Sequence, residues 1–225
     1  MVHGPVKKSF VYGVGLNDTK APVKKKDSLT GLLWRCPFYT AWTNMLRRCY
    51  SEVFLLKHPT YRGCRVCDEW LVFSNFKGWM STQDWKGKHL DKDILVPGNR
   101  VYSKEKCVFI SQSLNKLLHV HGELSGGLPL GVSVHESGKF VAQIVFDKKK
   151  THLGLFSEEM LAHQAWQKAK IQAIQNALKQ GLDERIEKRL HLIINNISED
   201  LLFKRKTENF TRNSDGADCM HLKAC

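Results

Sequence analysis

Apolar residues recur every three or four positions in two stretches of the first half of the chain. The stripe of the first stretch, within residues 38–53, consists of Tyr39, Trp42, Met45 and Leu46. The second stretch is aromatic, with Trp70, Phe73, Phe76 and Trp79. This spacing puts side chains on one side of an α-helix, so both stretches are predicted to be helices that bury an apolar face.

Residues 89–119 have a different pattern, in which two apolar runs flank a turn. Residues 89–96 and 101–110 are predicted to be strands, and Pro97-Gly98-Asn99 between them is typical of a tight turn. The apolar positions after Ser111 or Ser113 predict a short helix that runs to His119.

The second half alternates apolar and polar residues, as three short strands would. These strands are predicted at residues 130–136, 139–146 and 150–156, with turns at Ser137-Gly138 and at residues 147–148. Ser157 is suited to cap a following helix and Gly181 to end it. Residues 121–129 are Gly-rich and predict a linker, and residues 183–197 hold another possible helix.

These elements predict an α+β protein in four parts. Residues 1–33 are expected to form a basic N-terminal arm with one short strand at residues 9–15. Residues 34–120 contain the strand–strand–helix unit with its flanking helices. Residues 127–181 form a three-stranded antiparallel sheet packed on one helix, which we expect to bury its own core and to function by itself. Residues 182–225 form a helical and polar C-terminal tail.

The chain is strongly basic, with 35 Lys and Arg against 22 Asp and Glu in 225 residues, a net charge of +13. Such an excess favours a polyanionic partner, and double-stranded DNA is the partner we expect. RNA and an anionic membrane surface stay open on charge alone. We find no clear basic amphipathic helix or lipidation signal, and no apolar run near the ~20 residues of a membrane span.

Acidic side chains stand in the first predicted strand of residues 89–119. Alternate residues of a strand share a face, so His89, Asp91 and Asp93 are expected to point to one side. One imidazole and two carboxylates suit a divalent ion such as Mg²⁺, Mn²⁺ or Zn²⁺. Asn115 of the following helix is placed to reach the same ion.

This unit resembles the HNH (ββα-metal) nuclease family. The family signature is an Asp-His pair at the end of the first strand, an Asn in the loop and a final Asn or His in the helix. Here "LDKD", Asn99 and "SQSLN" take these places. The resemblance maps Asp91 onto the metal-binding Asp and Asn115 onto the helix ligand. Together with Asp93 of the same strand face, they are expected to hold Mg²⁺ or Mn²⁺.

Lys92 departs from the pattern because it occupies the place of the His that acts as general base. A Lys is cationic at neutral pH and is a poor base unless burial lowers its pKa. His89 or a neighbouring Asp could take that role in catalysis. The alternative is a nuclease fold that lost catalysis and kept binding.

The seven cysteines are odd in number and unevenly spread, which favours reduced thiols or a metal over a disulfide framework. Cys64 and Cys67 have the only paired spacing. A structural zinc needs four ligands, and the other two would have to come from Cys36, Cys49, His58 or Cys107. Because a second C-x-x-C is lacking, packing of free thiols is the favoured interpretation.

Residues 127–181 resemble the plant ethylene-response-factor (apetala-type) DNA-binding domain, with landmarks in "LGVSVHESGKFVAQI" and "HLGLFSEEMLAHQAW". In that family a three-stranded sheet lies in the major groove and the helix packs behind it. The resemblance implies a DNA-contacting set of Ser133, His135, Lys139, Gln143, Val145, Lys150 and His152. Alternation implies an opposite, core-facing set of Val132, Val134, Phe140, Ala142 and Ile144.

The two resemblances together predict a DNA-binding protein of the phage or mobile-element type. The favoured function is a divalent-metal-dependent, site-directed DNA endonuclease of the homing or nicking kind. A catalytically inactive DNA-binding regulator is the alternative. The expected location is cytoplasmic, in the host cell if a phage encodes the protein.

Overall fold

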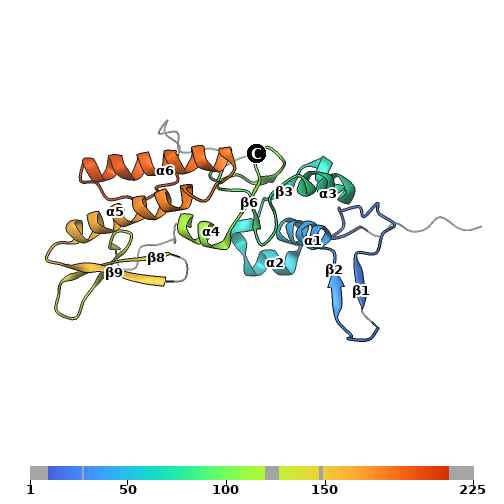
Figure 1. The fold of residues 1–225 in the computed structure, drawn as a ribbon, viewed down its shortest axis with the longest axis horizontal. Coiled ribbons are helices and arrows are strands. Elements are labelled where there is room, and N and C mark those ends of the chain that lie inside the picture. Colours follow the sequence, from blue (N-terminus) through green and yellow to red (C-terminus); the bar gives the residue numbers. More distant parts are fainter. Residues whose placement is uncertain (1–9, 27, 120–126, 147–148, 213–225) are drawn as a thin grey trace, which may run out of the picture. The chain divides into compact units, whose positions relative to one another are not determined.

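The computed structural model describes residues 10–26, 28–119, 127–146 and 149–212 (Figure 1). The chain divides into two compact units, residues 1–109 and 110–225. Both contain helices and small sheets, so the predicted α+β class is confirmed. The turn at residues 147–148, most of the linker and the end of the tail lie outside the described residues.

The first unit begins with a turn and a short hairpin. The strand expected at residues 9–15 is instead a turn, in which the amide of Val11 donates to Gly15 O at 2.8 Å and the amide of Gly15 donates back. Strands β1 (Lys24–Lys26) and β2 (Leu33–Arg35) then pair antiparallel. The segment before them is tied to the unit, because Leu16 forms a bridge with Val72.

Both helices predicted in the first half are confirmed. They are α1 (Pro37–Tyr50) and α3 (Phe73–Ser81), with the short α2 (Glu52–Lys57) following α1. Their apolar stripes meet in one aromatic core, and the indole nitrogen of Trp42 donates to Trp70 O at 2.7 Å. Trp70 lies in the 3-10 turn η2 (Asp68–Leu71) that leads into α3. Asp18 serves the start of α3 by accepting from the amide of Ser74 at 3.0 Å.

The strands after α3 are shorter than the sequence predicts. Strand β4 (His89–Asp91) pairs with β6 (Val108–Ile110), whereas β5 (Val101–Tyr102) pairs in parallel with β3 (Arg65–Val66). The strand predicted at residues 89–96 therefore ends at Asp91. The strand predicted at residues 101–110 is broken by a turn in which the amide of Cys107 donates to Ser103 O at 2.9 Å.

The second unit holds the predicted sheet, in the order β7–β8–β9, and it is antiparallel throughout. Its strands are β7 (Val132–Val134), β8 (Phe140–Phe146) and β9 (Lys149–Phe156). Helix α4 (Gln112–Leu118) precedes the sheet, with Ser111 as its N-cap residue. Helix α5 (Glu159–Leu178) packs on the sheet, with Glu158 rather than the expected Ser157 in the N-cap position.

A last helix, α6 (Glu184–Leu202), lies alongside α5 (Figure 1). It is longer than the possible helix predicted at residues 183–197. Its buried side includes Ile186, Leu190, Ile193 and Ile197, each no more than 2% exposed. The segment after it is also held in place, because the amide of Thr207 donates to Nε2 of His163 on α5 at 2.9 Å. One face of α6 and the segment after it therefore contribute to the core of the second unit.

Candidate functional site

Lys92 is the central residue of the loop between β4 and β5. It is only 8% exposed, and its ammonium donates to Asp93 Oδ1 at 2.6 Å and to Asn99 O at 2.8 Å. It also lies 5.9 Å from the centre of the Tyr61 ring. In this position Lys92 donates hydrogen bonds that hold the loop, a structural role that does not suit a general base.

Asn99 holds the other side of the same loop. Its Nδ2 donates to Lys92 O at 2.9 Å and to Val101 O at 2.8 Å, and its Oδ1 accepts from the amide of Val101 at 3.0 Å. Pro97 and Gly98 form the preceding turn, in which Gly98 has a φ of 71°. That conformation suits Gly at the third position of a type II turn. Asn99 therefore fixes the loop through its side chain.

Asp91 ends β4 through its own carboxylate. Its Oδ1 accepts from the amides of Asp93 at 2.9 Å and of Ile94 at 2.8 Å, an Asx turn that bends the chain out of the strand. Strand β4 therefore includes His89 and Asp91 but not Asp93. Burial still alternates through the turn, because Leu90 and Lys92 are buried whereas His89 and Asp93 are exposed and Asp91 is half-buried, so the shared face of the three residues stays a prediction.

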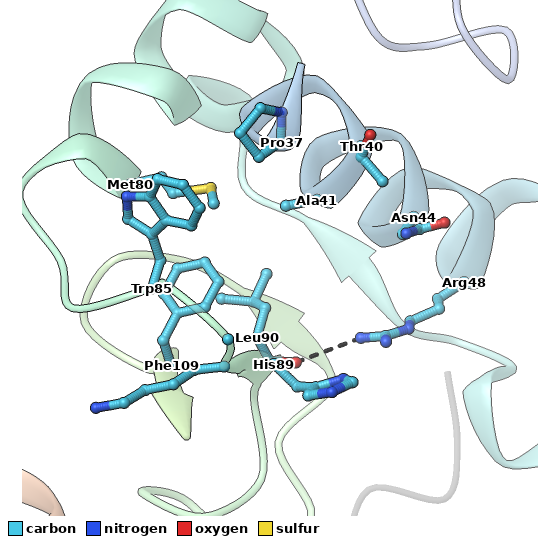
Figure 2. Close-up of a pocket in the computed structure, with 12 residues that line it drawn as sticks. Pro37, Thr40, Ala41, Asn44, Arg48, Met80, Trp85, His89, Leu90 and Phe109 are labelled. Carbon is cyan, nitrogen blue, oxygen red and sulfur yellow. Dashed lines mark hydrogen bonds between the residues drawn. The ribbon is translucent and has the colours of Figure 1, made fainter. Parts of the chain in front are cut away.

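His89 lines a pocket of about 310 Å³ beside α1 (Figure 2). Arg48 reaches from α1 toward β4, where its guanidinium donates to Leu90 O at 3.3 Å. Lys88 also lines the pocket and forms an ion pair with the exposed Asp84. No Asp or Glu is among the described residues that line it, so the pocket suits an anion more than a cation.

The environment of Arg48 supports its charged form. Burial lowers the pKa of this guanidinium, but the neighbouring Tyr102, Tyr61 and Asp91 raise it, and the net direction is upward. Burial also raises the pKa of the Tyr102 phenol. Arg48 is a functional candidate that the sequence motifs did not reveal. Its signal was two adjacent arginines, Arg47 and Arg48, placed beyond the apolar stripe of α1.

In the first unit, the carboxylate oxygens of Asp91 and Asp93 are not well arranged to bind a metal ion. Across the described ranges, no group of three or more His, Cys, Asp and Glu side chains is placed to hold an ion. Asp93 Oδ1 is paired with the Lys92 ammonium, and Asp91 Oδ1 accepts two amides. Asn115 is half-buried on α4 in the second unit, so its expected approach to Asp91 stays a prediction.

The cysteines of the first unit pack as free thiols. Cys64 is buried and Cys67 half-buried, and all five described cysteines are free. Burial raises the pKa of Cys49 and of Cys107 to about 12, so both stay protonated at neutral pH. Their surroundings match the favoured packing interpretation. For the less favoured alternative, zinc at Cys64 and Cys67, no group of three or more ligands is placed among the described residues.

The sheet of the second unit presents a row of mostly polar side chains in register. Gln143 lies opposite His152, and Val145 lies opposite Lys150. Val145 is 59% exposed, and Lys150 and His152 are exposed as well. Ala142 and Ile144, which alternate with Gln143 and Val145 along β8, are buried on the opposite face of the sheet. Ser133 is opposite Val141 on β8 and extends the row to β7.

A bulge in β9 keeps this row together. Ala142 pairs with Gly154 but Gln143 pairs with His152, so Leu153 is the extra residue. Gly154 has a φ of 138°, which glycine adopts at low cost. Alternation alone could not locate this shift, although a Gly within an apolar run is a known signal for it.

Three members of the expected sets lie at the end of β7 or in the turn that follows it. Val134 is 60% exposed, so its assignment to the core-facing set is wrong, because β7 ends there and the chain enters a turn. His135 and Lys139 form that turn, where the amide of His135 donates to Lys139 O at 2.8 Å. Nδ1 of His135 also lies 2.8 Å from Ser137 Oγ. These two residues stand at the hairpin end of the sheet.

A scan against protein-family models, a search of curated proteins and a search of solved structures each find no match for this chain. No helix in the described parts of the chain has the length and apolar character that crossing a bilayer requires.

Proposed function

We propose that the protein binds double-stranded DNA and that the sheet β7–β8–β9 reads the base edges. The observation that carries this proposal is the row formed by the half-buried Gln143 and the exposed Val145, Lys150 and His152, on a sheet whose other face is covered by α5. A chain with a net charge of +13 supplies the attraction for the phosphate backbone.

The chemistry of the row suits the major groove, which admits β-structure and displays a distinct pattern for each base pair. The amide of Gln143 can donate to and accept from adenine. The ammonium of Lys150 can donate to guanine or to a phosphate. Val145 offers an apolar surface to a thymine methyl group. The close pairing of Gln143 with His152 and of Val145 with Lys150 brings these functions onto one small patch.

The test compares Gln143→Ala and Lys150→Ala with Lys168→Ala, which removes a charge from the exposed side of α5. Fluorescence anisotropy over a library of duplexes would measure affinity and sequence preference. We expect Gln143→Ala to relax preference at one base pair, by about 1–3 kcal/mol. We expect Lys150→Ala to weaken binding more than the control. If Gln143→Ala and Lys150→Ala have the same affinity and sequence preference as Lys168→Ala, the sheet is not the surface that reads the DNA sequence.

Metal-dependent DNA cleavage is the second candidate function. It is favoured by the order β4, β6, α4 and by Asp91 at the end of β4 in a loop that Asn99 fixes. In that case His89, which lines the same pocket as Arg48, would act as the general base in place of Lys92. An ion bound to Asp93 would have to compete with the Lys92 ammonium for that carboxylate, so the residues present favour binding without cleavage.

A plasmid assay separates the two functions. Supercoiled DNA is incubated with Mg²⁺ or Mn²⁺, with and without a chelator, using the wild type, His89→Ala and Asp91→Asn. We expect all three to bind the plasmid and to leave it intact. Nicking or linearisation that the chelator stops, and that both substitutions abolish, would establish the endonuclease instead.

A further inference from the structure

A second cationic hollow lies next to the pocket beside His89 along α1, within the first unit. Its volume is about 370 Å³, and it is bounded by the β1–β2 hairpin, by α1 and by the turn at residues 11–15. The lining residues include Lys24 and Arg35, which lie opposite each other in the hairpin, and Arg47 of α1. Thr40 and Asn44 line both this hollow and the pocket beside His89.

The three cations share the hollow without a counter-charge. No Asp or Glu is among the described residues that line it, and none of the ion pairs within the described ranges involves Lys24, Arg35 or Arg47. The guanidinium of Arg47 lies 5.2 Å from the centre of the Phe54 ring. Like charges gathered without a partner indicate an anionic ligand.

Neutral groups complete the site. Asn44, Tyr12 and Tyr39 add an amide and two phenols, whereas the hydroxyls of Thr40 and Thr43 already donate to carbonyls of α1 and its N-cap residue. Tyr12 has a φ of 51°, a conformation that is rare for a bulky residue.

The turn that carries Tyr12 is anchored on α1. A Cβ added to Gly15 would lie 2.3 Å from Leu46 Cδ1 and 2.9 Å from Trp42 Cζ2, so this turn can pack on the helix only with Gly at that position. Two of the three elements around the hollow, the turn and α1, are therefore packed on each other.

We propose that this hollow binds a phosphate group of a DNA backbone. Two arginines and a lysine match the preference of phosphate for forked and point-like cationic donors. Residues 1–109 carry 19 Lys and Arg against 9 Asp and Glu, a net charge of +10, so the surroundings reinforce the attraction. The inference rests on the proposed DNA binding and adds a backbone contact to the reading surface of the second unit.

The experiment uses the full chain with Lys24, Arg35 and Arg47 each replaced by Gln. A matched control replaces Lys57, Lys77 and Lys86 by Gln, since these three are exposed in the same unit and do not line the hollow. Affinity for a duplex of about 30 base pairs is measured over a range of NaCl concentrations. Removal of one phosphate-binding interaction should make the slope of log K against log salt shallower by about 0.9.

We expect the hollow variant to bind roughly tenfold more weakly than the control at 0.1 M salt, with a shallower slope. Equal affinity and slope for the two variants, while the wild type binds DNA, would overturn the phosphate site and leave the proposed function standing. A wild type that binds no duplex would overturn the proposed function instead. Thermal unfolding by circular dichroism checks that both variants fold.

Two competitors identify the source of the anion. Inorganic phosphate and polyglutamate are titrated into wild-type protein by calorimetry. We expect weak phosphate binding that is absent from the hollow variant. Phosphate binding that disappears in the hollow variant while its DNA affinity stays unchanged would assign the site to a free phosphate. Tight polyglutamate binding that depends on the same three residues would assign it to an acidic protein segment.

Discussion

The ammonium of Lys92 is enclosed by two oxygen acceptors and by the ring of Tyr61. Lys92 and Asn99 bond to each other in both directions, because Asn99 Nδ2 donates to Lys92 O while Lys92 Nζ donates to Asn99 O. The pair closes the loop from both ends. The hydrogen bonds of Lys92 therefore give it a structural role in this loop.

Lys92→Met should lower the free energy of unfolding by about 1–3 kcal/mol, because it leaves a carboxylate and a buried carbonyl without their donor. Lys86→Met, at an exposed position nearby, should change it by less than about 0.5 kcal/mol. Urea denaturation of the three proteins provides the comparison. Equal stability of Lys92→Met and wild type would show that the ammonium contributes no net stabilisation.

Lys170 is a buried cation in the second unit. Its ammonium donates to Leu117 O and lies 4.6 Å from the centre of the Phe210 ring. Burial lowers its pKa from 10.5 to about 8. Between these two values the unfolded chain holds a proton that the folded chain has lost, so stability should rise with pH across this window.

The expected rise is about 3 kcal/mol from pH 8 to pH 10.5, at 1.36 kcal/mol for each pKa unit. Lys170→Met lacks this group, so the difference in unfolding free energy between the two proteins isolates its contribution. Urea denaturation at several pH values measures it. A difference that stays constant with pH would contradict the lowered pKa of Lys170.

At the scale of elements, α6 completes the second unit. His163 is fully buried and joins two segments, since its Nδ1 lies 2.9 Å from Leu130 O and its Nε2 accepts from the amide of Thr207. Asn196 of α6 donates to Phe210 O at 3.1 Å. The sheet and α5 therefore depend on residues that the sequence places in a tail.

Removal of residues 182–225 should abolish cooperative unfolding of the second unit. Four buried aliphatic side chains of α6 each contribute about 1.5–3 kcal/mol, a total comparable to the whole stability of a domain. Removal of residues 213–225 alone serves as the control and should leave the transition in place. Thermal circular dichroism distinguishes the two. If the second unit of the protein that ends at residue 181 still unfolds cooperatively, residues 127–181 would be an independent module, as the sequence predicts.

At the scale of the whole molecule, positive charge is concentrated in one unit. Residues 1–109 have a net charge of +10, whereas residues 110–225 have 16 Lys and Arg against 13 Asp and Glu, a net charge of +3. The proposed reading surface thus belongs to the less charged unit. This division favours an arrangement in which the first unit contacts the phosphate backbone of the DNA and the second unit recognises the base sequence.

Affinity for duplex of random sequence should fall about a thousandfold between 50 and 200 mM salt, the change expected of about six phosphate contacts. Gln143→Ala should keep the same salt slope, because it removes an uncharged amide. Anisotropy titrations at four salt concentrations test both statements. An affinity that does not change with salt would contradict backbone binding driven by the positive charge.

The sequence by itself determined helices α1 and α3 of the first half and the antiparallel sheet of the second half. Helical periodicity located α1 and α3, and alternation placed Ala142 and Ile144 in the core, because both patterns follow from burial of one face. The same alternation set Gln143 and Val145 apart from these core positions.

Only the tertiary structure decided where the strands end and which polar side chains are engaged in hydrogen bonds within the protein. β4 ends at Asp91 because a carboxylate captures two backbone amides, and β9 shifts register at Leu153. Lys92 became structural through acceptors that include the backbone of Asn99, seven residues away. The hollow around Arg47 joins residues from three elements. Such partners are distant in sequence or depend on backbone geometry, so no local pattern encodes them.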